Sequence, residues 1–166
     1  MSNTPDPRRA PGLLLGIGLG GFVDGILLHQ LLQWHHMVSA VTGSPADTVA
    51  GLQVDTFWDG VFHVGTWIAV AAGTFLLWRR STHSSWTADR GSLLGWMIVG
   101  WGVFNIVEGV VNHQLSGIHH VRDDLGGPLS WDIGFLAFGA VVTIIGWAIV
   151  RTGHDRGDAA RATEVR

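Results

Sequence analysis

The sequence contains no cysteine, no tyrosine and no lysine, and only 14% of its residues are charged. The lack of cysteine excludes disulfide bonds, thiolate metal sites and thiol nucleophiles. The charged share is well below the roughly 25% of an average soluble protein, and a net charge of −3 gives no basic surface for nucleic acid. What remains is a chain of 166 residues, 47% of them apolar, with nine tryptophans and nine histidines. This length predicts one domain.

Four apolar segments are long enough to cross a bilayer, which takes about 20 residues. They run over residues 13–34, 57–78, 93–115 and 129–150. Tryptophans lie near several of their ends, as is typical of side chains at the membrane interface. The sequence therefore predicts an all-α fold, a four-helix transmembrane bundle whose main partner is the lipid bilayer.

The arginines predict the orientation of the four crossings. They gather before the first segment, between the second and third, and after the fourth (Arg8, Arg9, Arg79, Arg80, Arg90, Arg151, Arg156 and Arg161). Positive residues favour the cytoplasmic side, so both termini are predicted to be cytoplasmic in a multi-pass membrane protein. We expect a cytoplasmic tail over residues 1–11, a membrane domain over 12–151 and a polar cytoplasmic tail over 152–166.

An internal repeat is visible within the membrane domain. Residues 23–36 read VDGILLHQLLQWHH, and residues 107–120 read VEGVVNHQLSGIHH. An acid–glycine pair, a His-Gln-Leu triplet and a His-His pair recur at one constant offset. The second and fourth segments match less well, mainly through a Trp-Asp pair at 58–59 and at 131–132. The pattern predicts two tandem helical hairpins, over 12–80 and 91–151, related by an axis along the membrane normal.

Several ionisable side chains lie within these crossings or at their ends, where each costs at least about 2.5 kcal/mol and usually faces the bundle interior. With a rise of about 1.5 Å per residue, His29, His63 and His113 share one depth in the outer half of the bundle. Asp24 and Glu108 lie deeper. Imidazole nitrogens and carboxylate oxygens are ligands of copper, iron and zinc, so these residues predict a transition-metal site.

The predicted ligands are His29, His63, His113, Asp59 and Glu108. Partners that orient these ligands, or replace them, are predicted at Asp24, Asp132, His36, His120 and Asn112. The second repeat has Leu136 where the first has His63, which predicts an asymmetric site. The alternative interpretation of His36 and His120, and the one given to His35 and His119, is that they are interfacial residues that contact water or cap a helix.

The spacing of acid and histidine leaves two alternatives. Asp24 and His29 are five residues apart, and so are Glu108 and His113. In a straight α-helix this spacing separates two side chains by about 140°. The acid and the histidine therefore serve different sites, or a π-helical turn, which joins residues i and i+5, brings them together.

Other functions are compatible with the same residues. His29 and His113 are candidates for the two axial ligands of a haem. Asp24 and Glu108 are candidates for a proton or ion pathway, and the histidines and acids together for a structural hydrogen-bond network. Whether the protein is an enzyme stays undecided, and the Glu-x-x-His spacing of di-iron helical bundles is absent from these segments.

The two histidine-rich segments, together with the Trp-Asp-Gly-x-Phe-His motif at residues 58–63, resemble a bacterial membrane protein family known as domain of unknown function 2243. The resemblance covers residues 12–151. It implies a four-helix inner-membrane protein with no established activity. It also implies relatives near copper-oxidase assembly genes, which favours copper as the metal. The implied partner is another membrane subunit or a copper-oxidase assembly factor.

Overall fold

The computed structural model describes residues 6–41, 48–82 and 90–164, and these residues are almost entirely helical. Helix α1 (Arg9–Asp24) continues into a π-helix, η1 (Gly25–Leu31), and α3 (Arg90–Glu108) continues into a second π-helix, η2 (Gly109–Ser116). The other elements are α2 (Val49–Ser81), the short 3-10 helix η3 (Asp123–Leu125) and α4 (Leu129–Glu164). Four of these stretches are long and apolar enough to cross a membrane, which confirms the predicted all-α, four-helix fold.

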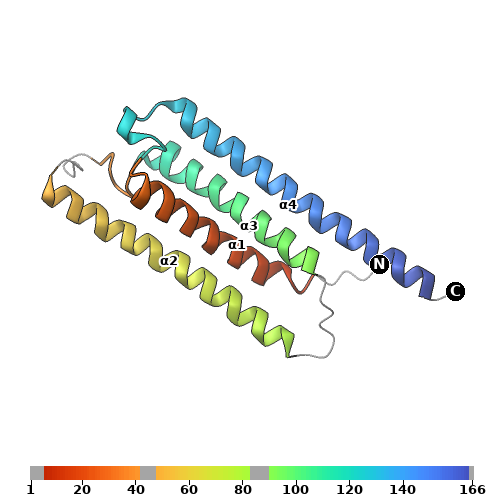
Figure 1. The fold of residues 1–166 in the computed structure, drawn as a ribbon. Helices are drawn as coiled ribbons and strands as arrows, with labels where there is room; N and C mark the ends of the chain where they lie inside the picture. Colours follow the sequence, from red (N-terminus) through yellow and green to blue (C-terminus); the bar gives the residue numbers. More distant parts are fainter. Residues whose placement is uncertain (1–5, 42–47, 83–89, 165–166) are drawn as a thin grey trace.

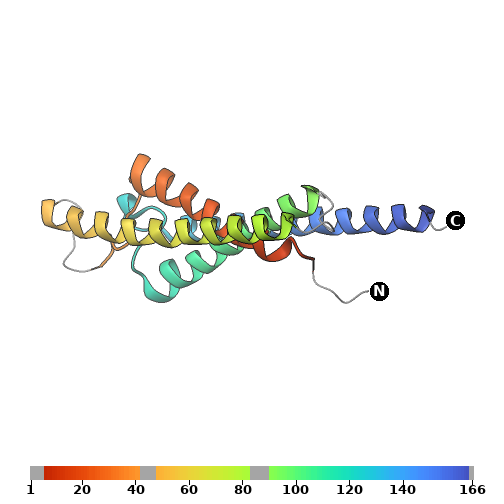
Figure 2. The same cartoon turned by 90° about the horizontal axis from the view of Figure 1, so that it is seen from below.

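The four long helices lie side by side in the order α2, α1, α3, α4 (Figure 1). Helix α1 packs against α2 and α3, and α4 packs against α3. The central pair, α1 and α3, runs in one direction, and α2 and α4 return in the other (Figure 1). Figure 2 shows that α1 and α3 cross, so that η1 and η2 leave the layer on opposite faces. We call α1, η1 and α2 the first half of the protein, and α3, η2 and α4 the second half.

Helices α1 and α3 approach closely because each presents a glycine to the backbone of the other. A Cβ atom at Gly16 would lie 2.0 Å from the carbonyl oxygen of Met97, and one at Gly100 would lie 2.4 Å from the carbonyl oxygen of Leu13. No larger residue fits at either position without moving the backbone. Small residues at such crossings are typical of helix pairs in lipid, where close van der Waals packing drives association.

The helix boundaries differ from the sequence prediction in three places. Helix α2 begins at Val49 rather than near residue 57, and the side chain of Thr48 caps it by accepting a hydrogen bond from the Gly51 amide (3.0 Å). Helix α4 continues to Glu164, well beyond the predicted end of its crossing at residue 150. The first crossing ends earlier than predicted, at Leu31, because the chain turns at Gln33.

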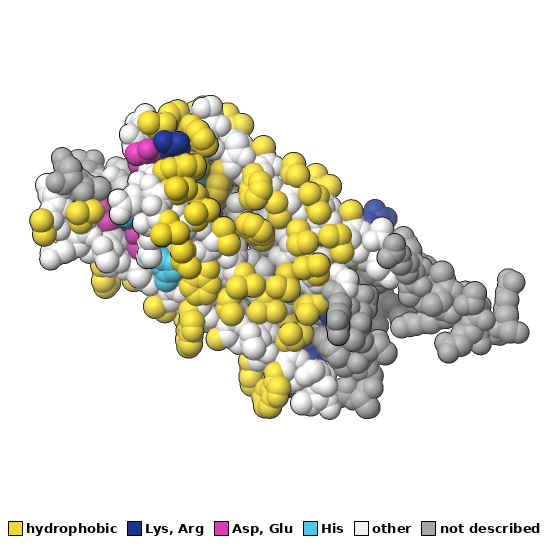
Figure 3. Space-filling model, viewed as in Figure 1, with side chains coloured by type: hydrophobic (Ala, Val, Ile, Leu, Met, Phe, Trp, Pro, Cys, Tyr) yellow, Lys and Arg dark blue, Asp and Glu magenta, His cyan; other side chains and the backbone are white. Residues whose placement is uncertain are grey.

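The two ends of the bundle have different interiors. At the end where α1 and α3 begin, the interior is an apolar cluster of Trp96, Val99 and Val150, with Leu13 and Val103 against it. At the end where η1 and η2 lie, the buried side chains are histidines and acids. Figure 3 shows apolar side chains over most of one face, with acidic and histidine side chains gathered toward this second end.

Candidate metal centre

The two π-helices bring the acid and the histidine of each repeat motif together. The distance from His29 Nε2 to Asp24 Oδ2 is 3.3 Å, and the distance from His113 Nε2 to Glu108 Oε1 is 3.2 Å. A π-helix makes i to i+5 contacts, so it removes the angular separation that an α-helix imposes at this spacing. Each acid therefore lies in the same site as its histidine, which decides between the two alternatives left by the sequence.

A tight turn then folds the following His-His pair back onto the bundle. Gln33 (φ 51°) and Gly117 (φ 58°) both lie in the left-handed region at the corresponding point of the two halves. As a result His35 and His119 are buried, with 2% and 0% of their surface exposed, and their rings stack at 4.6 Å with 9° between the planes. The interpretation of His35 and His119 as residues in contact with water is therefore wrong.

The stacked pair is held by hydrogen bonds that cross between the two halves. His35 Nδ1 donates to the backbone carbonyl of Val121 (3.0 Å), and His119 Nδ1 donates to the backbone carbonyl of Met37 (3.0 Å). A carbonyl oxygen only accepts, so Nδ1 must carry the proton in both rings. The Nε2 atom of each ring therefore faces the centre of the cluster.

The other two buried histidines are oriented by carboxylates from α2 and α4. His29 Nδ1 donates to Asp59 Oδ1 (2.9 Å), and His113 Nδ1 lies 3.5 Å from Asp132 Oδ1. Asp59 also accepts from His36 Nδ1 (2.8 Å) and from the backbone N–H of Met37 (2.8 Å). Asp132 accepts in the same way from His120 Nδ1 (2.7 Å) and from the backbone N–H of Val121 (3.0 Å). Asp59 and Asp132 thus fix the rings beside them.

Six side chains meet between the halves, and we call them the central cluster: Asp24, His29, His35, Glu108, His113 and His119. Two overlapping groups in this cluster bring their possible ligand atoms within 4.8 Å of one another: His29 with His35 and His119, and Glu108 with His113 and His119. The cluster is thus made of four imidazoles and two carboxylates, and every one of these side chains is buried.

Many polar atoms of the central cluster have no hydrogen-bond partner among the described residues. They are Asp24 Oδ2, His29 Nε2, His35 Nε2, Glu108 Oε2 and both ring nitrogens of His113. The exception is His119 Nε2, which lies 2.7 Å from Glu108 Oε1. Unpaired polar atoms are rare in protein interiors and cost free energy. Their concentration here distinguishes the central cluster from the rest of the described interior.

Two histidines outside the crossings have displaced pKa values. Burial lowers the pKa of the His35 imidazole well below its ordinary value, and charge on His119 and His29 lowers it further. A neutral imidazole is the form that binds metal ions. The hydrogen bond to Asp59 raises the pKa of His36, which is half-buried beside it.

His63 and Asn112 lie beside the central cluster rather than in it. His63 belongs to neither group of possible ligand atoms. Its Nδ1 donates to the backbone carbonyl of Asp59 (2.7 Å), and its ring stacks on Phe22 at 5.9 Å. The Asn112 amide donates weakly to Glu108 Oε1 (3.4 Å). The structure thus brings together His29, His113 and Glu108 of the predicted ligands but not His63.

Sequence reasoning missed His35 and His119 as members of the cluster. The feature that could have identified them is the recurrence of the motif, because both histidines of the pair at 35–36 recur at 119–120. Their burial depends on the turn at Gln33 and Gly117, which hydropathy alone does not indicate.

The fold and this geometry define a four-crossing membrane protein with a buried histidine–carboxylate cluster between its two halves. Residues 11–153 match the family of predicted membrane proteins designated domain of unknown function 2243, and the chain belongs to this family. The match covers the whole predicted membrane domain and confirms the family resemblance. No curated protein and no solved structure matches the chain.

Proposed function

We propose that the protein binds transition-metal ions in the membrane, and that the central cluster holds a pair of them. The observation that carries this proposal is the orientation of the four buried histidines. Each turns Nδ1 toward a carboxylate or a backbone carbonyl. The Nε2 atoms of His29, His113 and His119 lie within 3.3 Å of Asp24 or Glu108, and His35 Nε2 has no hydrogen-bond partner among the described residues. Ligating histidines are typically held in this way, since the bond at the outer nitrogen sets the tautomer and raises the basicity of the other.

The charge balance favours two ions over one. Four of the buried acids, Asp24, Asp59, Glu108 and Asp132, form ion pairs with histidines at or beside the central cluster. Buried charge needs compensation. Two divalent cations would neutralise four carboxylates and leave the imidazoles neutral.

Each half would supply one set of ligands. The first ion would bind His29 and His35, with Asp24 beside His29, and the second would bind Glu108 and His113; His119 belongs to both groups of ligand atoms. Two imidazoles and one carboxylate leave coordination positions open, as in reactive rather than structural metal sites. This donor set suits iron, copper and zinc. Under this proposal His35 and His119 take the ligand role first assigned to His63.

The two alternatives receive less support. A haem between His29 and His113 would need the space of the stacked His35 and His119 rings, which lie within 6.1 Å of both residues. A proton pathway would place protons, rather than metal ions, between Nε2 atoms and the carboxylates. The poor hydrogen-bond alignment at 3.3 and 3.2 Å favours an ion there instead.

We further propose that the two halves derive from one duplicated hairpin. With both termini cytoplasmic, as the arginines predict, the central cluster lies in the outer half of a bacterial inner membrane. A metal ion would then exchange on the outer side. A second membrane subunit or a copper-oxidase assembly factor would dock at the same end.

The test is the metal content of detergent-purified protein by mass spectrometry, with an absorption spectrum of the same sample. We expect about two equivalents of iron, copper or zinc. His119→Ala should lose most of this metal, because His119 belongs to both groups of ligand atoms. His120→Ala is the matched control and should retain it, because the ring of His120 is partly exposed and bonds Asp132 from outside the cluster.

Three results would contradict the proposal. The first is wild-type protein without metal after reconstitution with each candidate ion. The second is His119→Ala with the full wild-type content. The third is an intense Soret band, which would establish the haem alternative. A metal-free preparation would direct the next measurement to proton flux in liposomes and its loss in Glu108→Gln.

A further inference from the structure

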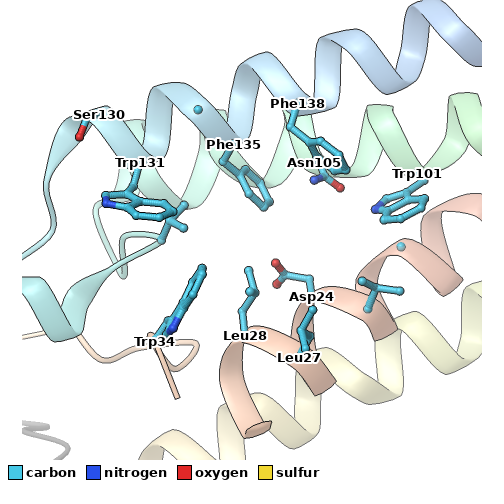
Figure 4. Close-up of a pocket in the computed structure, with 14 residues that line it drawn as sticks. Asp24, Leu27, Leu28, Trp34, Trp101, Asn105, Ser130, Trp131, Phe135 and Phe138 are labelled. Carbon is cyan, nitrogen blue, oxygen red and sulfur yellow. The ribbon is translucent and has the colours of Figure 1, made fainter. Parts of the chain in front are cut away.

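A groove lies between the α1–η1 stretch and α4, and it leads to the central cluster. Its volume is about 580 Å³, within the range of roughly 300–1,000 Å³ that is typical of small-molecule sites. The walls are mostly apolar, and five of the fourteen lining residues are aromatic: Trp34, Trp101, Trp131, Phe135 and Phe138 (Figure 4). The rim residues Val23, Leu27 and Phe138 are exposed on membrane-spanning helices, so the groove opens toward lipid.

Two buried acceptors point into this groove. Asp24 and Asn105 are 5% and 3% exposed, and Figure 4 shows both side chains directed into the space between the helices. Asn105 Oδ1 accepts no hydrogen bond from any described residue, and Asp24 Oδ2 has His29 Nε2 at 3.3 Å, without the alignment of a hydrogen bond. A ligand that reaches this point gains most if its head carries hydrogen-bond donors, since it would satisfy both oxygens.

The outer end of the groove is covered by an aromatic stack. Trp34 and Trp131 meet edge to face with ring centroids 5.5 Å apart, and the Arg122 guanidinium lies over both rings at 4.4 and 5.0 Å. Arg122 is itself paired with Asp124 (2.8 Å). With this end covered, the route to Asp24 runs sideways from the bilayer, which selects a ligand dissolved in lipid.

We propose that this groove binds a lipid-soluble ligand with a hydroxylated aromatic head, of the quinol class. The flat aromatic walls suit an aromatic ring, which packs against such faces. The two buried oxygens suit its two hydroxyl donors, and the exposed rim suits its hydrocarbon tail. The inference deepens the proposed function and rests on it only through Asp24, which contributes to both sites.

The corresponding cavity of the second half does not offer the same site. It lies between α3–η2 and α2, has a volume of about 280 Å³ and is lined by Phe62, Glu108 and Asn112 among others. Glu108 Oε1 already lies 3.4 Å from the Asn112 amide and 2.7 Å from His119 Nε2, whereas Glu108 Oε2 has no partner among the described residues. The volume, which falls below the roughly 300–1,000 Å³ of small-molecule sites, assigns the quinol to the first cavity.

Binding is tested by quenching of tryptophan fluorescence, because three tryptophans line the groove. The probes are decylhydroquinone, its redox-inert 1,4-dimethyl ether and decanol, added anaerobically in detergent. Decylhydroquinone should bind about tenfold more tightly than its ether, which keeps the shape but has no O–H donor. Equal affinities for the two would overturn the inference, and decanol binding as tightly as decylhydroquinone would overturn the aromatic head.

The variant that fills the groove is Gly134→Phe. Gly134 lines the groove, and a Cβ atom there would have no neighbour within 4 Å, so the fold should tolerate it. Gly60→Phe on α2 is the matched control, since Gly60 has the same free space but lines neither cavity. Gly134→Phe should abolish quinol binding and Gly60→Phe should preserve it. Wild-type affinity in folded Gly134→Phe would overturn the assignment.

Asn105→Leu separates this inference from the metal proposal. Asn105 lies outside the central cluster, so the variant should keep its metal content and lose about tenfold in affinity for decylhydroquinone. Metal is measured in every sample. If wild-type protein binds the quinol but no metal, the metal proposal is contradicted and the quinol proposal stands. If it holds metal but binds no quinol, only the quinol proposal is contradicted.

Discussion

The two halves of the protein make similar contacts at corresponding positions, and the acid of the central cluster is one place where they diverge. Asp24 reaches only His29 among the histidines (3.3 Å). Glu108, longer by one methylene, reaches both His113 (3.2 Å) and His119 (2.7 Å). The corresponding nitrogen in the first half, Nε2 of His35, has no hydrogen-bond partner. A single methylene thus distinguishes two otherwise equivalent ligand sets, and we expect their affinities to differ.

The halves also diverge beside the π-helices. A Cβ atom at Gly25 would lie 2.7 Å from His63 Nε2, and one at Gly109 would lie 2.9 Å from the Leu136 side chain. Gly25 therefore lets α2 approach η1, and Gly109 lets α4 approach η2 in the same way. The side chain that contacts the glycine is the imidazole of His63 in the first half and the aliphatic chain of Leu136 in the second. This shared position indicates that His63 packs against η1 rather than belonging to the central cluster.

The largest effect expected from this comparison comes from removing the longer acid. Glu108→Gln should lose one of the two proposed ions and weaken the binding of the other, because Glu108 contacts two histidines. Asp24→Asn should lose one ion and leave the second unchanged. Metal content and competition with a chelator measure both variants. A greater loss in Asp24→Asn would contradict the asymmetry.

The exchange variant Asp24→Glu sharpens the same comparison. A longer side chain at this position should reach His35 Nε2 as Glu108 reaches His119, and so bring the two metal affinities closer together. Two dissociation constants that stay as far apart as in the wild type would show that the methylene is not the cause.

A smaller effect is expected from the acids that orient the histidines. Asp59→Asn and Asp132→Asn should each lower metal affinity by about 10–100-fold, as is usual for partners of ligating histidines. The loss should be greater for Asp59→Asn, because Asp59 lies 2.9 Å from His29 whereas Asp132 lies 3.5 Å from His113. Chelator titrations at one fixed pH compare the two. An unchanged affinity in both would mean that the outer nitrogens do not control the site.

The smallest effect is expected from His63→Leu, which gives the first half the residue of the second. Metal content and affinity should remain as in the wild type, because His63 lies outside both groups of ligand atoms. The thermal midpoint should change little, since leucine occupies the matching position over Gly109. If the variant instead loses its metal, the ligand role that the sequence predicts for His63 is correct.

Much of the architecture follows from the sequence because its causes are local. Apolar length alone predicts four crossings, and the five-residue spacing of Asp24 and His29 already allows a π-helix as one of two alternatives. The recurrence of acid, histidine and His-His pair also places the polar residues at corresponding points of two hairpins. These features depend on residues that are close along the chain, so they can be predicted from segment length, residue spacing and the recurrence of motifs.

Only the tertiary structure decided the membership of the central cluster. His35 is buried because the chain turns at Gln33 and because its ring bonds the carbonyl of Val121, 86 residues away. Neither contact leaves a periodic pattern in the sequence, since a turn in the left-handed region at a glutamine is rare and the carbonyl belongs to the other half. The sequence thus determined which chemical groups the membrane domain contains, and the packing of one half against the other determined which of them meet.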